Sequence, residues 1–409
     1  MTVAEHEEHP IAEQLRRLSS TDPLYAVSFV DVFLRAAVQV GASDLHLQPT
    51  CEGLDLQWRL DGMLHRIGTF ASGTSSDIVT RLKVLADLLT YRTDAPQEGR
   101  IRNPSWSSEM RVSTYPTLFG ERAVVRIFSA PNQLLYPREL GLPDETLNDW
   151  NKFLSQSSGV LVVSGPAGSG KTTTAYASLR ELLRVPQGVR SILTIEDPIE
   201  VPLPGAAQAQ VSPTFSLATA LRSALRQDPE VLLVGEIRDP DVARGVFNAA
   251  LTGHLVLSTL HAGSAAQAVC RLADMGIEPY LMHSGLRAVL NQRLARRLCR
   301  CARETSDLRE LLGLPVSSAR IAVGCQDCQQ TGYAGRVLIT EFLILDSNSV
   351  SRTAIPLPDR EWDAASLERR AVQAGMIPLR QRGIGLVADG TTSPVEFHRV
   401  LGDAGLVVD

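Results

Sequence analysis

The sequence predicts an α/β protein: a largely parallel sheet, a smaller α+β domain before it and a mainly helical part at the end. Short apolar runs that alternate with helical stretches predict the sheet. These runs are GVLVVSG, SILTIED, VLLVGE and HLVLSTL. A turn-rich segment, PNQLLYPRELGLPD, separates them from an N-terminal region that mixes strand and helix patterns, which indicates a second domain.

Composition narrows the class of protein. The 409 residues allow two or three domains, and 44% apolar and 21% charged residues are typical of soluble globular proteins. A net charge of -5 provides no general attraction to nucleic acid or to an anionic membrane. No apolar run approaches the roughly eighteen residues that span a bilayer, and the acidic N-terminus does not resemble a secretory signal. We therefore expect a cytoplasmic protein whose six cysteines are reduced.

The smaller domain is predicted over residues 25–130, after a polar segment at 1–24. Its first element is an amphipathic helix that ends at Gly41, a glycine stop. A second helix is predicted in IVTRLKVLADLL. Alternating patterns predict the strands, with an Asp61-Gly62 turn inside the second run: DLHLQPT, GLDLQWRLDGMLHRIG, EMRVSTYPT and ERAVVRIFSA.

A linker at 131–145 leads to the larger domain, predicted over 146–409. This domain includes a cysteine cluster at 299–328 and a helical part at 345–409, and the last hundred or so residues are expected to be mainly helical. Thr392 or Ser393 is a predicted cap of the final helix, with Pro394 at its first position.

A phosphate-binding loop follows the first strand of the larger domain. GPAGSGKTT lies between the strand VLVVS and the helix TTTAYASLRELL, which is the context that a P-loop requires. Glycines allow backbone N–H groups to wrap phosphates, the lysine reaches the β- and γ-phosphates, and the first threonine coordinates Mg²⁺. The predicted nucleotide-binding residues are Gly165, Pro166, Ala167, Gly168, Ser169, Gly170, Lys171, Thr172 and Thr173.

Acidic residues end two other predicted strands. Glu236 follows VLLVG, where Gly235 occupies the position of the usual Walker B aspartate, and we expect Glu236 to bind magnesium or polarise the attacking water. A structural salt bridge with Arg238 is the alternative. A second acidic cluster, beginning at Glu196, closes ILTIEDPIE. His254 and His261 flank the next strand, where either can sense the γ-phosphate, hydrogen-bond a catalytic acid or be merely structural.

At this point the sequence resembles the type II secretion and type IV pilus assembly ATPases. The resemblance extends from about residue 25 to the end. It is carried by GPAGSGKTTT, LTIEDPIE, LRSALRQDPEVLLVGEIRD and TGHLVLSTLHA, and by flanking motifs such as GASDLHLQP, RVSTYPTLFGERAVVRI, RLARRLC and TGYAGRVLITEFL.

The resemblance implies a RecA-like P-loop ATPase domain in a hexameric motor that hydrolyses ATP to assemble a pilus-like fibre or to secrete protein. It favours Glu196 and Glu236 as the catalytic acids, with Lys171 and His261 in the same site. It also implies that arginines of the smaller domain approach the phosphates, Arg111 and Arg126 first among them. The expected partners are other subunits of a homohexamer and an inner-membrane platform protein, so that membrane contact is peripheral and indirect.

Four cysteines extend the resemblance. Secretion and pilus-extension members of the family bind zinc through two C-x-x-C pairs; Cys325 and Cys328 fit this pattern, whereas Cys299 and Cys301 are one residue too close. We expect a structural zinc site in which a local turn accommodates the short pair. Four reduced cysteines without metal are the alternative.

Two other functions compete with the ATP-driven secretion motor. A nucleic-acid motor predicts stimulation by DNA, and the negative net charge disfavours it. A nucleotide-gated scaffold with little turnover is suggested by Gly235, although the resembling family shares this glycine.

Overall fold

The computed structural model describes residues 10–70, 75–101, 109–128, 135–184, 190–345, 353–357 and 363–402. The beginnings of the predicted polar segment and linker, and parts of the predicted helical end, lie outside the described residues. The chain divides into two compact units, Met1–Pro131 and Asn132–Asp409. In the described part of the chain, no helix is long and apolar enough to cross a bilayer.

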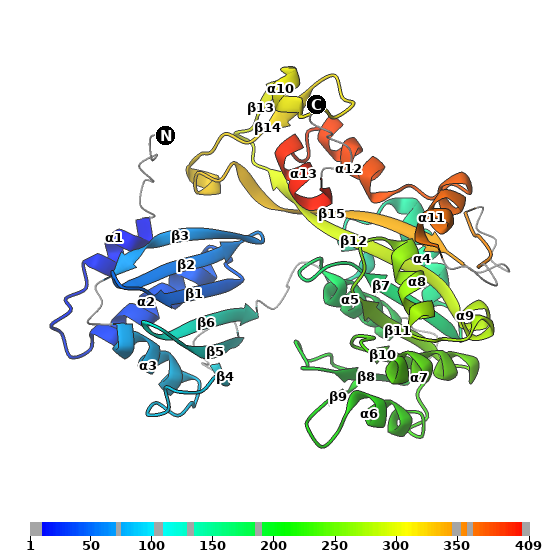
Figure 1. Ribbon diagram of the computed structural model, residues 1–409, viewed down its shortest axis with the longest axis horizontal. Helices are drawn as coiled ribbons and strands as arrows, with labels where there is room; N and C mark the ends of the chain where they lie inside the picture. The colour runs from blue at the N-terminus through cyan, green and yellow to red at the C-terminus, as the bar shows by residue number, and fades with distance from the viewer. Residues whose placement is uncertain are drawn as a thin grey trace. The chain divides into compact units, whose positions relative to one another are not determined.

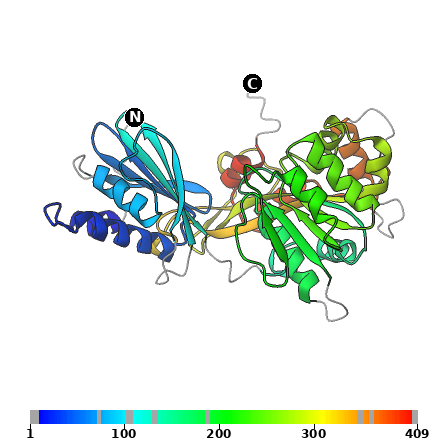
Figure 2. The same cartoon turned by 90° about the horizontal axis from the view of Figure 1, so that it is seen from below.

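The first unit is an antiparallel six-stranded sheet with the order β3-β2-β1-β6-β5-β4. Asp61 and Gly62 both have positive φ, as the predicted two-residue turn between β2 and β3 requires. One sheet face packs against the helices (Figure 2). The elements are α1 (Pro10–Arg16), α2 (Tyr25–Gln39), β1 (Asp44–Pro49), β2 (Leu54–Leu60), β3 (Met63–Phe70), α3 (Ser75–Leu85), β4 (Gln97–Ile101), β5 (Glu109–Thr117) and β6 (Gly120–Phe128).

Two elements of this unit were not predicted. Helix α1 lies within the predicted polar segment 1–24, yet its Ile11, Ala12 and Leu15 are buried in the core of the unit. Its single apolar stripe is too short to be recognised among the surrounding charges. Strand β4 is polar and pairs with only one neighbour, β5, so that no alternating apolar pattern marks it.

The second unit contains a seven-stranded mixed sheet with the order β15-β12-β7-β11-β10-β8-β9. Six strands are parallel and the edge strand β15 is antiparallel. The predicted runs form β7, β8, β10 and β11. The strands are β7 (Gly159–Ser164), β8 (Ile192–Glu196), β9 (Ala207–Gln210), β10 (Val231–Val234), β11 (Leu255–Leu260), β12 (Leu286–Leu298) and β15 (Tyr333–Ile344).

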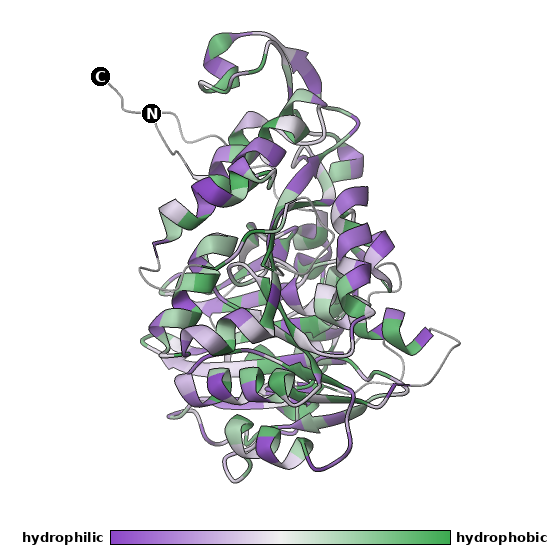
Figure 3. Cartoon of the chain, turned by 90° about the vertical axis from the view of Figure 1, so that its right-hand side faces the viewer, coloured by the Kyte–Doolittle hydropathy of each residue, from purple (hydrophilic) through white to green (hydrophobic). Residues whose placement is uncertain are grey.

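Helices cover both faces of this sheet, which divides the apolar core into two clusters. In the hydropathy colouring, purple and green alternate along the outer helices, as expected for elements with one buried face (Figure 3). The helices are α4 (Asp144–Leu154), α5 (Lys171–Arg184), α6 (Leu217–Ala224), α7 (Pro240–Leu251), α8 (Ala265–Asp274), α9 (Pro279–Gly285), α11 (Ala364–Gln373), α12 (Leu379–Ala388) and α13 (Pro394–Leu401).

Strands β12 and β15 differ most from the prediction. Neither was among the predicted strands, and β15 falls in the last hundred residues, expected to be mainly helical. The two pair along most of their length. Beyond their paired ends lies a small subdomain of β13 (Arg303–Thr305), α10 (Leu308–Leu311) and β14 (Ala319–Ile321) (Figure 1).

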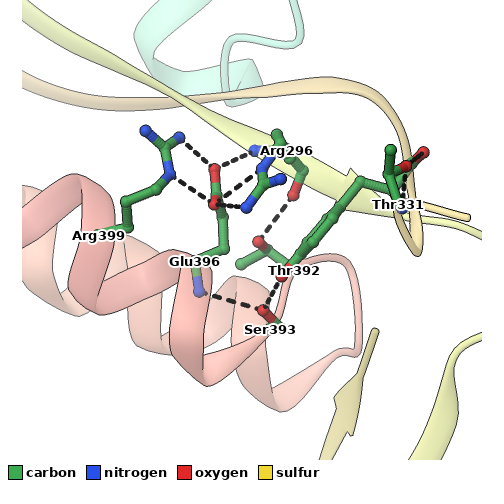
Figure 4. A network of polar contacts seen from close by, with 7 residues as sticks. Arg296, Thr331, Thr392, Ser393, Glu396 and Arg399 are labelled. Atoms are coloured by element: carbon green, nitrogen blue, oxygen red, sulfur yellow. Dashed lines mark hydrogen bonds and ion pairs between the residues drawn. The ribbon is translucent and has the colours of Figure 1, made fainter. Parts of the chain in front are cut away.

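Helix α13 is held to β12 by a buried ion cluster. Ser393 caps α13 by accepting from the Glu396 amide at 3.1 Å, with Pro394 at the first position, as predicted. Glu396 is 0% exposed and accepts from the Arg296 guanidinium at 2.8 and 3.0 Å and from Arg399 Nε at 2.7 Å (Figure 4). Thr392 donates to the Arg296 carbonyl at 2.8 Å. This cluster fixes α13 against β12.

Candidate active site

Four adjacent parallel strands deliver the predicted site residues to one edge of the sheet. The P-loop follows β7, His261 follows β11, Glu236 follows β10, and Glu196 ends β8. The strand order places β11 between β7 and β10, and β8 beyond β10. Because carboxyl ends of parallel strands meet at one edge, residues far apart in the sequence form a single candidate site.

The backbone of the P-loop needs its glycines. Gly165 and Gly170 have φ values of 149° and 87°, which non-glycine residues rarely adopt. A Cβ on Gly165 would overlap the carbonyl oxygen of Gln292, and one on Gly170 would lie 3.2 Å from the Gln292 side-chain amide. The glycines therefore permit both the turn and its close approach to β12.

Lys171 begins α5, and its side chain folds back over the loop. Its Nζ donates to the carbonyl oxygens of Gly165 at 3.0 Å and Pro166 at 2.9 Å. Burial lowers the pKa of Lys171, and the nearby Glu236 carboxylate partly offsets this effect. The cation is thus held at the loop by weak carbonyl acceptors, which an anionic phosphate can replace.

Glu236 lies in a row of charged groups. His261 Nε2 is 3.0 Å from Glu236 Oε1, and His261 Nδ1 is 3.5 Å from Lys171 Nζ. Arg238 Nε donates to Glu236 Oε2 at 2.7 Å, and Arg238 also lies 3.5 Å from Asp197. A neutral imidazole that donates from Nε2 to Glu236 leaves Nδ1 to accept from the lysine. The imidazole therefore lies between Lys171 and the candidate acid, Glu236.

Glu236 forms a salt bridge with Arg238, as expected if Glu236 had only a structural role. The pair is not closed off from solvent, however: the side chain of Arg238 is 61% exposed and that of Glu236 is 18% exposed. An exposed ion pair contributes little to stability. The salt bridge and a chemical role of Glu236 are therefore compatible.

Glu196 lies in a different environment. It is 4% exposed. Its Oε1 accepts from Thr194 Oγ1 at 2.5 Å and from Gln208 Nε2 at 3.1 Å, and its Oε2 accepts from the Tyr176 hydroxyl. Burial and this hydrogen bond raise the pKa of Tyr176, so the phenol keeps its proton. Glu196 thus joins α5, β8 and β9 through three neutral donors.

Packing explains the glycine at the Walker B aspartate position. The Gly235 amide donates to the Ile195 carbonyl at 2.9 Å. A Cβ at residue 235 would lie 3.2 Å from that carbonyl oxygen and 3.5 Å from the Glu196 Cα. A side chain at residue 235 would therefore crowd β8, the strand that bears Glu196. The acidic residue of this strand end is Glu236, one residue later.

The structure separates the two predicted histidines. His254 Nδ1 lies 2.9 Å from the Ala249 carbonyl at the end of α7, at the opposite edge of the sheet from the P-loop. His261 alone of the two reaches the candidate site.

The predicted arginines belong to the first unit. Arg111 and Arg126 are directly paired across β5 and β6. Arg126 Nε donates to Asp44 at 2.9 Å, and Arg111 forms an ion pair with Glu98. The sheet brings the two arginines together on one face, each with an acidic partner.

The four cysteines meet where β12 ends and β15 begins. The sulfur–sulfur distances are 3.8 Å for Cys299–Cys325, 3.9 Å for Cys301–Cys328 and 3.7 Å for Cys325–Cys328, and all four sulfurs lie within 4.8 Å of one another. Four sulfurs at about 2.3 Å from a zinc ion form a tetrahedron with edges of about 3.8 Å. The spacing therefore fits zinc, and it is too long for disulfides.

A turn accommodates the short C-x-C pair, as expected. The Ala302 amide donates to the Cys299 carbonyl at 3.0 Å, which turns the chain between the two sulfurs. Burial raises the pKa of Cys328, but amide donors at Cys325 and Gly332 outweigh it and lower the value to about 7. Donors aimed at a sulfur favour the thiolate, the form that binds metal.

Sequence reasoning missed three polar residues beside the P-loop: Asn291, Gln292 and Arg293 of β12. Gln292 is 1% exposed and bonds to the loop, while Asn291 and Arg293 bond to the segment that carries His261. The available signal was the run of three consecutive polar residues, NQR, in the middle of LRAVLNQRLARRL.

Sequence comparison finds related proteins along most of the chain. Residues 19–400 match the family described as "Type II/IV secretion system protein". The chain is 39% identical over 92% of its length to the type IV pilus assembly ATPase TfpB of Acinetobacter baylyi, and 38% identical over 96% to the type II secretion system protein HxcR of Pseudomonas aeruginosa. It spans 66% and 81% of these relatives, respectively.

Solved structures support the predicted RecA-like α/β fold. The ATPase DotB of Legionella pneumophila aligns with a TM-score of 0.67 over 93% of this chain and 97% of its own, at 20% identity. The pilus retraction motor PilT with bound ADP aligns with a TM-score of 0.60 over 91% and 96%, at 22% identity. The match over residues 19–400, together with the identities to the curated relatives, shows that this chain belongs to the type II/IV secretion system protein family.

Proposed function

We propose that this chain hydrolyses ATP and that the reaction powers protein secretion or the assembly of a pilus-like fibre. The observation that carries the proposal is the continuous row Lys171, His261 and Glu236 at the P-loop. A lysine for phosphates beside an oriented carboxylate is what hydrolysis of a nucleoside triphosphate needs. The names of the relatives, secretion and pilus-assembly ATPases, support the same activity.

Each predicted site residue has a proposed role in this reaction. Lys171 leaves the carbonyls of the loop and binds the β- and γ-phosphates, while the backbone N–H groups of the loop surround them. Thr172 and Glu236 hold Mg²⁺, directly or through water, and Glu236 polarises the attacking water. His261 keeps Glu236 oriented and contacts Lys171 through its other ring nitrogen. Arg111 and Arg126 remain proposed to stabilise charge on the phosphates once they leave their acidic partners.

For Glu196 we propose a positioning role alongside the predicted catalytic one. Its oxygens are occupied by Tyr176, Thr194 and Gln208. In this arrangement it orients the carboxyl end of β8 and the helix that follows the P-loop. To polarise water directly, it must first release one of these donors.

The partners proposed are other copies of the chain, in a homohexamer, and a platform protein of an inner-membrane machine. Membrane contact is then indirect. A nucleic-acid motor stays an alternative outcome of the test below, recognised by stimulation with DNA. A nucleotide-gated scaffold is recognised by ATP binding without turnover.

The deciding experiment is magnesium-dependent ATP hydrolysis measured across protein concentration. We expect turnover per chain to rise with concentration, because assembly completes the site. Lys171→Ala should abolish both nucleotide binding and turnover. Lys152→Ala, at an exposed lysine on α4, is the control and should behave like the unchanged protein. Turnover that survives in Lys171→Ala contradicts the site.

A structural zinc ion in the cysteine cluster is a second, independent proposal. Zinc bound by Cys299, Cys301, Cys325 and Cys328 would supply a fixed crosslink between the end of β12 and the start of β15. We expect about one zinc per chain by elemental analysis. Cys325→Ser should lose it, whereas Cys51→Ser, at an exposed cysteine of the first unit, should retain it. Unchanged protein without zinc would favour four reduced, unliganded cysteines.

A further inference from the structure

Strand β12 carries three consecutive polar residues inside the sheet, between β7 and β15. Asn291 and Gln292 are 0% and 1% exposed, and Arg293 follows them. A buried amide without a hydrogen-bond partner is costly, so such residues persist in a core only where they are bonded. All three bond to the two loops that form the candidate site.

Gln292 holds the P-loop. Its Nε2 donates to the Ser169 carbonyl at 2.7 Å, and its Oε1 accepts from Thr174 Oγ1 at 2.9 Å. One side-chain amide therefore joins the loop to the first turn of α5. The glycines at 165 and 170 allow the loop to lie against this residue.

Asn291 and Arg293 hold the segment that carries His261. Asn291 Nδ2 donates to Ser164 Oγ at 2.8 Å and to the Ala262 carbonyl at 3.3 Å. Arg293 Nη2 donates to the Gly263 carbonyl at 2.7 Å. From α8, Arg271 donates to the His261 carbonyl at 2.7 Å. Three successive carbonyl groups, at residues 261–263, are thus each bonded by a side chain.

We propose that Asn291, Gln292 and Arg293 are positioning residues that set the distance between the P-loop and the His261 segment. The inference rests on the proposed ATP hydrolysis, because this distance determines whether Lys171 and the His261–Glu236 pair act on the same phosphate. Both segments are irregular backbone, so side-chain hydrogen bonds from the neighbouring rigid strand help to define their position. A displacement of about 1 Å at a reacting centre can reduce the rate about 10²-fold.

The test uses the full-length chain with Gln292→Met, which keeps the side-chain length but removes the hydrogen bonds, and Arg293→Met, which keeps an unbranched aliphatic stem but removes the guanidinium group. Gln292→Met should speed hydrogen exchange in residues 165–170 and weaken Mg-ADP binding about tenfold. Arg293→Met should speed exchange in residues 261–263 and lower kcat about 10–100-fold, with Mg-ADP affinity unchanged. Arg297→Met, at an exposed arginine on the same strand, should alter neither segment.

Thr174→Val provides a milder test of the same contact if Gln292→Met does not fold. It removes only the hydroxyl that bonds Gln292 and should speed exchange in residues 165–170. The inference would be overturned if hydrogen exchange in both segments stayed equal to that of the unchanged protein. It would also be overturned if each variant sped exchange in both segments to the same extent. If the unchanged protein has no turnover, the proposed function fails, whereas exchange and Mg-ADP affinity still decide this inference.

Discussion

Glu236→Gln is expected to lower the rate of ATP hydrolysis by about 10²–10⁴-fold, the usual contribution of a positioned acid or base. Glutamine keeps the size of the side chain and can still accept from His261 Nε2, but it cannot take a proton from water. Nucleotide affinity should fall far less than turnover, because Lys171, Thr172 and the loop amides remain. Steady-state kinetics and Mg-ADP titration measure the two quantities separately.

The matched control for this prediction is Glu230→Gln. Glu230 precedes the same strand, β10, at its opposite end, where it accepts from the Ser191 amide at 3.2 Å. Its replacement should leave turnover unchanged. If Glu236→Gln retains full turnover and lowers the melting temperature instead, Glu236 serves only the ion pair with Arg238, and the acid must be sought elsewhere.

Glu396→Ala is expected to destabilise the second unit by about 3–5 kcal/mol. The variant leaves the buried guanidinium of Arg296 without its carboxylate, and the side chain of Arg296 is only 12% exposed. The contact between α13 and β12 would weaken with it. Calorimetry should show a fall in melting temperature on the order of 10 °C for the transition of this unit.

A partly exposed ion pair provides the control. Arg382 Nη2 lies 2.6 Å from Glu145 Oε1, and the two side chains are 22% and 65% exposed, respectively. Glu145→Ala should therefore cost less than about 1 kcal/mol. Equal melting temperatures for the two variants would show that the Glu396 cluster adds no more than a surface pair.

The same cluster predicts how the unit responds to acid. Burial alone would raise the pKa of Glu396, but the guanidinium groups of Arg399 and Arg296 outweigh it and hold the pKa below 4.5. A carboxyl group with a lowered folded-state pKa stabilises fully above its unfolded pKa and loses this contribution as pH falls through the folded value. The difference in stability between the unchanged protein and Glu396→Gln should therefore shrink below pH 4.5.

Local patterns were enough for much of the fold. Four apolar runs predicted β7, β8, β10 and β11, and Asp61-Gly62 predicted the turn between β2 and β3. These elements are recognisable because each depends on adjacent residues: apolar side chains for a buried strand, and positive φ for a tight turn. The cap at Ser393 is local in the same sense.

Strands β12 and β15 lacked such a signal. β12, LRAVLNQRLARRL, is rich in leucine and arginine, which favour helices in isolation. It is a strand because β7 and β15 offer hydrogen bonds on both sides. Context of this kind overrides intrinsic propensity, and no window of sequence contains it.

Short motifs with local geometry were enough to predict the phosphate loop, the acids at the strand ends and the two cysteine pairs. Which of these groups lie together depends on how the whole chain folds. Lys171 and His261 are 90 residues apart, and Gln292 and Thr174 are 118 apart. Their contact depends on strand order and register, which follow from packing across the whole sheet. The sheet thus places His261, and not His254, beside Lys171 and Glu236, and it places the polar residues of β12 beside the loop.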